Sequence, residues 1–224
     1  MRYVMIWIVI ALITLALAGS YILDADASRF RLTIEINTPE GTKSGSSVIQ
    51  TQHYASGTWG PVEAKNIVSQ AKGTAVVIDL GDNRQLLGIL GFGPDGSDES
   101  KLFGLVRAAL AGGEPVSWKD DHKLKGRGEL HPDYVPALIL FSDANDPKTA
   151  RLVVPTDFSS MIGPGYSFKR AFIETTKDPI SRDIADKLPW WGKPDRPAVV
   201  AWKAWGGGTV TKYSIGPERL FLKE

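Results

Sequence analysis

The densest group of side chains that could do chemistry lies in the segment KDDHKLKGRGELHPD, residues 119–133. It supplies a candidate catalytic set, which consists of Asp120, His122, His131 and Asp133. Imidazole and carboxylate groups bind zinc or harder divalent cations, and a histidine beside a carboxylate can transfer protons. One hypothesis is therefore a periplasmic hydrolase or metal-dependent enzyme that uses this segment.

The spacing of these residues argues against that hypothesis. The segment contains neither H-E-x-x-H nor the register of an EF-hand loop. Lys123, Lys125 and Arg127 interrupt the acidic residues, and such mixed charge is typical of solvated surface. We therefore expect a charged surface loop with no bound metal and no cofactor, and we keep the enzyme as the alternative.

Other catalytic signatures are weaker. The serines of SGSS, residues 44–47, lack the second glycine of a G-x-S-x-G elbow. The glycines near residues 91–93 do not continue into a dinucleotide-binding or phosphate-binding loop. The chain has no cysteine, which excludes disulfides, thiol catalysis and thiolate metal sites.

Tryptophans form the second candidate site. Four of the seven fall within sixteen residues, at Trp190, Trp191, Trp202 and Trp205. Tryptophan can anchor a protein contact, stack on a sugar or bury a large apolar area. Alternation along the predicted strand at residues 198–205 places Trp202 in the core, and we expect one of Trp190 and Trp191 to close the preceding helix against Trp202. The candidate binding residues are Trp190, Trp191 and Trp205.

Residues 3–23 contain no charged side chain in 21 positions, and as a helix they would span about 30 Å, the thickness of a bilayer core. Arg2 precedes this segment and Asp24 follows it. The distribution predicts a single-pass anchor in the bacterial cytoplasmic membrane, with the N-terminus inside and the rest outside. The alternative is a signal peptide, because Ala-Leu-Ala at residues 16–18 resembles a cleavage site and would release a periplasmic protein.

Hairpin patterns dominate the remaining chain. Residues 29–36 alternate between apolar and polar side chains and are followed by a turn and a returning strand at 44–54, and residues 73–80 and 85–92 repeat this arrangement. Further strands are predicted at residues 136–141, 150–155, 165–176, 198–205 and 209–216. Helical spacing predicts helices at 98–111 and 178–188, the second with Asp178 as its N-cap.

These elements predict an α+β fold, in which a mostly antiparallel sheet built from hairpins packs with two helices. We expect three regions: the membrane segment at 1–23, a short linker at 24–28 and a single extracytoplasmic domain at 29–224. Hydrophobic residues make up 43% of the chain, which is ordinary for a globular domain. The net charge of +1 gives no reason to expect a nucleic-acid partner.

The segments RLTIEINTPEGTKSGSSVIQ and IETTKDPISRDIADKLPWW resemble a group of bacterial envelope proteins of unknown function, with an N-terminal hydrophobic segment. Lys43, Ser44 and Gly45 stand where that group has Thr-Gly. The resemblance implies an envelope location and no activity, cofactor or catalytic residue. We therefore expect a non-enzymatic binding or structural component of the envelope, whose partners are the lipid bilayer through residues 3–23 and another envelope protein. Glycan binding through the tryptophans is a weaker alternative.

Overall fold

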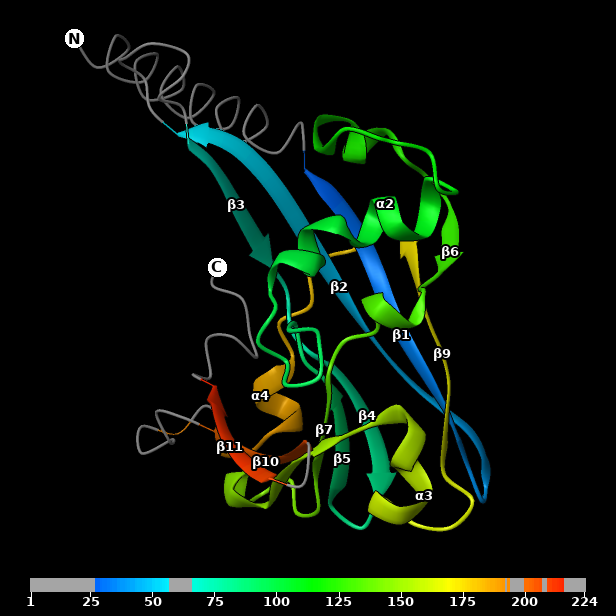
Figure 1. The fold of residues 1–224 in the computed structure, drawn as a ribbon, viewed down its shortest axis with the longest axis vertical. Coiled ribbons are helices and arrows are strands. Elements are labelled where there is room, and N and C mark those ends of the chain that lie inside the picture. Colours follow the sequence, from blue (N-terminus) through cyan, green and yellow to red (C-terminus); the bar gives the residue numbers. More distant parts are fainter. Residues whose placement is uncertain (1–26, 57–65, 192, 194–199, 207–208, 216–224) are drawn as a thin grey trace, which may run out of the picture.

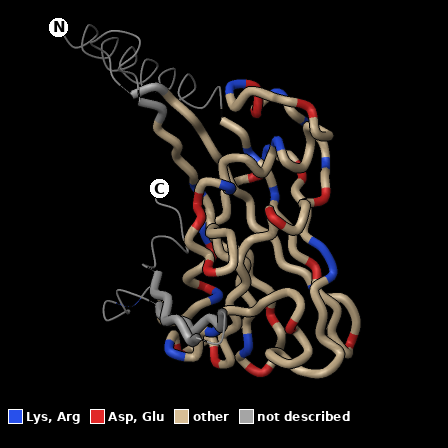
Figure 2. Tube along the Cα trace, viewed as in Figure 1, with Lys and Arg blue, Asp and Glu red and all other residues tan. Residues whose placement is uncertain are grey.

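The computed structural model describes residues 27–56, 66–191, 193, 200–206 and 209–215. The predicted membrane segment at residues 3–23 lies outside this part. Among the described residues, none of the helices combines the length and the apolar character that crossing a membrane requires. Acidic and basic residues are interspersed along the described trace (Figure 2).

The larger sheet is antiparallel and has the strand order β3-β2-β1-β9-β6. Its strands are β1 (Ser28–Thr38), β2 (Gly41–Ser56), β3 (Asn66–Lys72), β6 (Arg127–Glu129) and β9 (Ser167–Thr175). β1 is buried at every second residue, as its apolar alternation predicts, and it pairs with β2 on one side and β9 on the other. β1 and β2 run the length of the described fold (Figure 1).

The smaller sheet is also antiparallel and has the order β4-β5-β7-β8. Its strands are β4 (Val76–Gly81), β5 (Arg84–Gly88), β7 (Leu138–Phe141) and β8 (Ala150–Val153). Asp82 and Asn83 connect β4 to β5 with φ angles of 53° and 59°, so both residues take the left-handed conformation of a tight hairpin turn. A separate hairpin of β10 (Val200–Gly206) and β11 (Thr209–Ile215) lies against β8 through β10.

Alternation along the strands of the smaller sheet divides the core in two. Val76, Ile78 and Leu86 belong to a cluster shared with the inner face of β1 and β9, so this cluster fills the space between the sheets. Val77 and Leu87 point the other way, into a second cluster. The sheets approach closely at Gly45, where a Cβ atom would lie 2.2 Å from the carbonyl oxygen of Val77.

The helices are short and connect or cover the sheets. The 3-10 helices are η2 (Ser100–Gly104), η3 (Trp118–Lys123), η4 (Pro132–Tyr134), η5 (Pro147–Thr149) and η6 (Pro155–Asp157). The α-helices are α2 (Leu105–Leu110), α3 (Phe158–Met161) and α4 (Ile184–Lys187). In Figure 1 the smaller sheet lies over one end of the long strands, and α2 lies over the other end.

The described part is mostly antiparallel sheet with few helices, which agrees with the predicted α+β class. Both predicted hairpins are present. The predicted helix at 98–111 forms as η2 followed by α2.

The predicted helix at 178–188 is wrong except for its last turn, α4. The residues before α4 lie along the larger sheet instead. The Asp178 carboxylate accepts a hydrogen bond from Arg31 at 2.5 Å, and the backbone N–H of Ser181 donates to the carbonyl of Val48 at 3.0 Å. These contacts with β1 and β2 replace the intrahelical hydrogen bonds that an isolated helix would make. Tertiary pairing therefore overrides the local helix signal.

Candidate functional site

An apolar pocket with a volume of about 870 Å³ lies in the described part. Its floor is the end of the smaller sheet, where Leu138 of β7 pairs with Val153 of β8, and both side chains are buried. Met161 of α3 and Val135, which follows η4, form walls. Because these elements also close the inter-sheet core, the pocket is an opening onto that core.

Proline gives the pocket its stiffness. Four prolines line it, and they are Pro94, Pro132, Pro136 and Pro155. Proline has a fixed φ and no backbone N–H, so these walls lose little entropy on binding and offer few hydrogen-bond donors. Val154 lies on the rim with 41% of its surface exposed, and only Tyr54 is a comparably exposed large apolar residue among the described residues. The pocket therefore suits an apolar ligand.

Charged groups stand at the mouth. Lys101 of η2 donates a hydrogen bond from Nζ to the backbone oxygen of Asp133 at 3.0 Å, and the ammonium lies 5.9 Å from the ring centre of Tyr134. Asp133 and Asp157, both exposed, also line the pocket. The two aspartates and the one lysine, whose ammonium donates to the backbone of Asp133, give the pocket mouth a net negative charge.

The predicted catalytic set does not assemble into a metal site. Among the described residues, which include all four members of the set, no group of three or more His, Cys, Asp or Glu side chains could hold a metal ion. Asp120 pairs with Lys123 at 2.6 Å, and this hydrogen bond lowers the pKa of Asp120. His131 lies 3.4 Å from the carboxylate of Asp133, and both side chains are exposed. His122 belongs to η3, whereas His131 and Asp133 belong to the start of η4.

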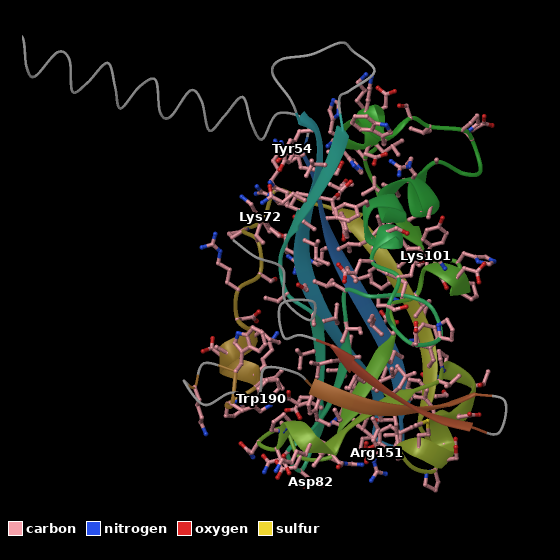
Figure 3. The ribbon with its side chains drawn as sticks, turned by 60° about the vertical axis from the view of Figure 1, so that its left-hand side comes forward. Tyr54, Lys72, Asp82, Lys101, Arg151 and Trp190 are labelled. Atoms are coloured by element: carbon pink, nitrogen blue, oxygen red, sulfur yellow. The ribbon has the colours of Figure 1, made fainter. Side chains whose placement is uncertain are left out.

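The three candidate binding tryptophans do not form one described surface. Trp190 is 4% exposed and packs with its ring centre 6.1 Å from that of Phe141, so it belongs to the second core cluster and offers no surface for binding. Trp191 is half-buried and lies edge-on to Trp190 at 5.9 Å. The backbone of Trp205 is in β10, and its side chain lies outside the described part. Figure 3 labels Trp190 beside α4, far from Lys101 at the pocket.

A polar cluster that the sequence did not indicate lies where η2, α2 and η3 cover the larger sheet. His53 of β2 and Ser69 of the neighbouring β3 are paired across the strands, and His53 Nδ1 lies 2.9 Å from Ser69 Oγ. The imidazole packs between Phe103 of η2 and Trp118 of η3, with ring centres 5.6 and 5.1 Å away. Its other nitrogen, Nε2, is buried and has no hydrogen-bond partner among the described residues.

Asp121 is the acidic member of this cluster. Its side chain is 6% exposed, and Oδ2 accepts a hydrogen bond from Arg107 of α2. Oδ1 of Asp121 and Nδ1 of His122 are buried without a hydrogen-bond partner among the described residues. We call His53, Ser69, Arg107 and Asp121 the His53–Asp121 cluster.

Burial shifts both titratable members of the cluster toward their neutral forms. It raises the pKa of Asp121, while the hydrogen bond and charge of Arg107 oppose that change. It lowers the pKa of His53, and the negative charge of Asp121 opposes this shift. The cluster thus holds an acid and a base whose protonation is sensitive to packing.

Sequence reasoning could not place these residues together. His53 falls in a predicted strand and Asp121 in a predicted surface loop, and only the pairing of β2 with β3 and the docking of η3 join them. One sequence feature could have indicated the cluster. Trp118 is closely followed by Asp-Asp-His at residues 120–122, and an amphipathic turn over these residues would bury one of the two adjacent acids, as η3 buries Asp121.

Comparisons with known proteins identify no relative. No family model matches the chain, no curated protein matches it, and no solved structure matches it.

Proposed function

We propose that this chain is a non-enzymatic binding domain of the bacterial cell envelope, held at the membrane by residues 3–23 and facing the periplasm. Its pocket accepts an extended apolar segment of another envelope protein. The observation that carries this proposal is the pocket itself, which combines buried apolar residues at its floor with the exposed Val154 at its rim. A concave, mostly apolar pocket of this kind commonly marks a binding site.

The size of the pocket favours a segment over a single side chain. A volume of about 870 Å³ lies near the upper end of the range of ligand pockets, roughly 300–1,000 Å³. Proline walls keep the space open without a ligand, because their backbone cannot readily rearrange. An extended segment can place several apolar side chains against Val154, Pro155 and Met161 at once.

The charges at the mouth favour a basic residue beside that apolar segment. Asp133 and Asp157 present carboxylates, while Lys101 already donates to the backbone of Asp133. A lysine or arginine flanking the bound segment would approach a negative surface, and complementary charge increases both association rate and specificity. An acidic flank would be repelled.

The membrane location is part of the proposal. The length and uniform apolar character of residues 3–23 support an uncleaved anchor, and Arg2 ahead of the segment supports an outward-facing domain. Cleavage after residue 18 would leave the same domain in the periplasm.

The test measures binding of a labelled peptide to the purified full-length protein in detergent by fluorescence anisotropy. The peptide has a centre of leucine, valine and proline and a lysine at each end, and a matched peptide has glutamate at both ends. We expect the lysine peptide to bind more tightly, and Val154→Asp to weaken its binding about tenfold, as truncation or charging of an interface anchor does.

Tyr54→Asp is the matched control, because Tyr54 is about equally exposed, does not line the pocket and lies well apart from Lys101, the pocket residue that Figure 3 labels. It should leave peptide affinity unchanged. Equal losses from Val154→Asp and Tyr54→Asp, or equal affinity for the two peptides, would overturn the proposal.

A further inference from the structure

One continuous helical segment, η2 and α2 at residues 100–110, touches both the pocket and the His53–Asp121 cluster. At its start Lys101 reaches the pocket mouth and bonds to the backbone of Asp133. Phe103 packs on the imidazole of His53. One turn later, Arg107 bonds to Asp121 and also donates to the backbone oxygen of Phe103 at 3.2 Å.

The helix η3 packs on this segment and the sheet, and two of its contacts involve titratable groups of the cluster. Trp118 packs on the ring of His53, and Asp121 pairs with Arg107. The outward residues of η3 pair with each other, since Lys123 binds Asp120. The packing of η3 therefore includes two titratable side chains of the cluster, the imidazole of His53 and the carboxyl group of Asp121.

Protonation of His53 disfavours this packing. The imidazole is enclosed by two aromatic rings, and its buried Nε2 makes no hydrogen bond among the described residues. The backbone of Phe103 and the charge of Asp121 favour a protonated ring, but burial opposes it more strongly. Burying the charge of an imidazolium costs free energy, and a solvated imidazolium avoids this cost. Movement of η3 and η2 away from the sheet would let water reach the ring.

We propose that acidification releases η3 from the His53–Asp121 cluster and, through residues 100–110, loosens the pocket mouth, so that the domain binds its apolar segment at neutral pH and releases it at mildly acidic pH. This inference concerns regulation of the pocket and rests on the proposed function. The transmitted motion is a shift of η2, which carries both Phe103 and Lys101. Displacing Lys101 breaks its bond to Asp133 and frees the wall formed by η4.

The direction of the pH effect follows from the groups around His53. Asp121 of η3 favours the charged imidazole, whereas burial and Arg107 of α2 disfavour it, and burial is the largest cause, so the pKa of His53 falls below its ordinary value near 6.5. Ser69 of β3 is polar and carries no charge. In the open form, in which η3 is released, the imidazole is solvated and takes up a proton as the pH falls through about 6.5. The closed form, in which η3 is packed, takes up this proton only at a lower pH, so acidification favours opening.

Asp121 acts in the opposite sense. Burial raises its pKa in the closed form, and the neighbouring charges of Arg107, His53 and His122 oppose that shift. A raised pKa means that protonating Asp121 favours the closed form, and this contribution grows as the pH falls toward the ordinary range of a carboxyl, near 4. The opening should therefore be measured at pH 5.5, within the range in which His53 responds and above the pH at which the opposing contribution of Asp121 is complete.

The experiment measures the affinity of the lysine-ended peptide for the full-length protein at pH 7.5 and 5.5. We expect a decrease of about fivefold or more at pH 5.5, the lower end of typical coupling between sites. His53→Phe and His53→Gln cannot titrate and should lose this decrease. One variant is apolar and the other is polar. If one of them fails to fold, the other can still be measured.

His131 provides the control, because its imidazole lies beside Asp133 at the pocket mouth and could change binding directly. His131→Gln should keep the decrease in affinity at pH 5.5. Hydrogen exchange in the absence of peptide gives a second measurement. Protection of residues 117–124, taken relative to the intrinsic exchange rate at each pH, should fall at pH 5.5 in the natural protein and not in the His53 variants.

The outcomes separate the two proposals. Absence of peptide binding at pH 7.5 would overturn the proposed function and this inference with it. Binding that is equal at both pH values, or a decrease that persists in both His53 variants, would overturn the inference and leave the proposed function standing. A decrease that disappears in His131→Gln would assign the pH effect to the pocket mouth and likewise overturn the inference.

Discussion

At the scale of single residues, burial decides which of two adjacent acids has a structural role. Asp120 faces outward and pairs with an exposed lysine, whereas Asp121 is 5% exposed and pairs with Arg107. The two carboxylates have the same chemistry and the same sequence surroundings. Their pKa values move in opposite directions, because a lysine hydrogen bond dominates for Asp120 and burial dominates for Asp121.

This difference predicts unequal costs of removing the two partners. Arg107→Met should lower the free energy of unfolding by about 3 kcal/mol, because it leaves a buried carboxylate without its counter-ion. Lys123→Met should cost less than about 1 kcal/mol, as is usual for exposed ion pairs. Urea denaturation at pH 7.5 measures both, and similar costs would contradict the distinction between the two aspartates.

At the scale of elements, the packing of the two sheets depends on a missing side chain. Gly45 of β2 lies under the backbone of β4, and a Cβ atom there would come within 2.2 Å of the Val77 carbonyl oxygen. A methyl group at this position must push the strands apart. The inter-sheet core next to it is fully buried, so this separation would open gaps between packed side chains.

Gly45→Ala should therefore reduce the free energy of unfolding by about 1–3 kcal/mol, the usual cost of overpacking a core. Ser44→Ala is the control, because Ser44 is the preceding residue of the same strand and is exposed. It should change the free energy by less than about 0.5 kcal/mol. Thermal or urea unfolding of the two variants provides the comparison.

How far the sequence could predict the structure also depends on the kind of element. Hairpins were predictable because strand alternation and turn residues lie close together in the chain, as in the Asp82-Asn83 turn. The helix predicted from Asp178 was not, because its residues pair with β1 and β2, which are distant in sequence. The short strand β6, inside the predicted charged loop, forms only because β9 provides its partner.

The candidate sites were predicted less well for the same reason. The pocket combines the ends of β7 and β8 with η4, η6 and α3, none of which carries a recognisable motif. The His53–Asp121 cluster needs the pairing of β2 with β3, and β3 had no clear signal in the sequence. Trp190 was predicted both as a candidate binding residue and as one of two tryptophans that could close the helix against Trp202. It is buried in the second cluster with Ile184 of α4. The side chain of Trp202 lies outside the described part.

At the scale of the whole molecule, the membrane proposal has a direct test. If residues 3–23 remain as an anchor, the chain extracted from bacterial membranes should have its full mass of 24.4 kDa and resist removal by alkaline carbonate. Replacing two residues of the span, Ile8→Lys with Ile13→Lys, should release the protein from the membrane fraction or block its insertion, because each lysine at that depth costs about 3 kcal/mol.

A shortened chain in the periplasmic fraction would instead show that the segment is a cleaved signal peptide. Recovery of the full-length chain in the cytoplasmic fraction would contradict both forms of the proposal.

The central position of β1 has a mechanical consequence. β1 is hydrogen-bonded to β2 and β9 along nearly its whole length, and it is the first described strand after the proposed anchor. A force between the membrane and a partner bound at the pocket would enter the domain at Ser28 and pull β1 lengthwise against both neighbours. Many hydrogen bonds would then bear the load together, so the domain should withstand tension better than one attached through an edge strand.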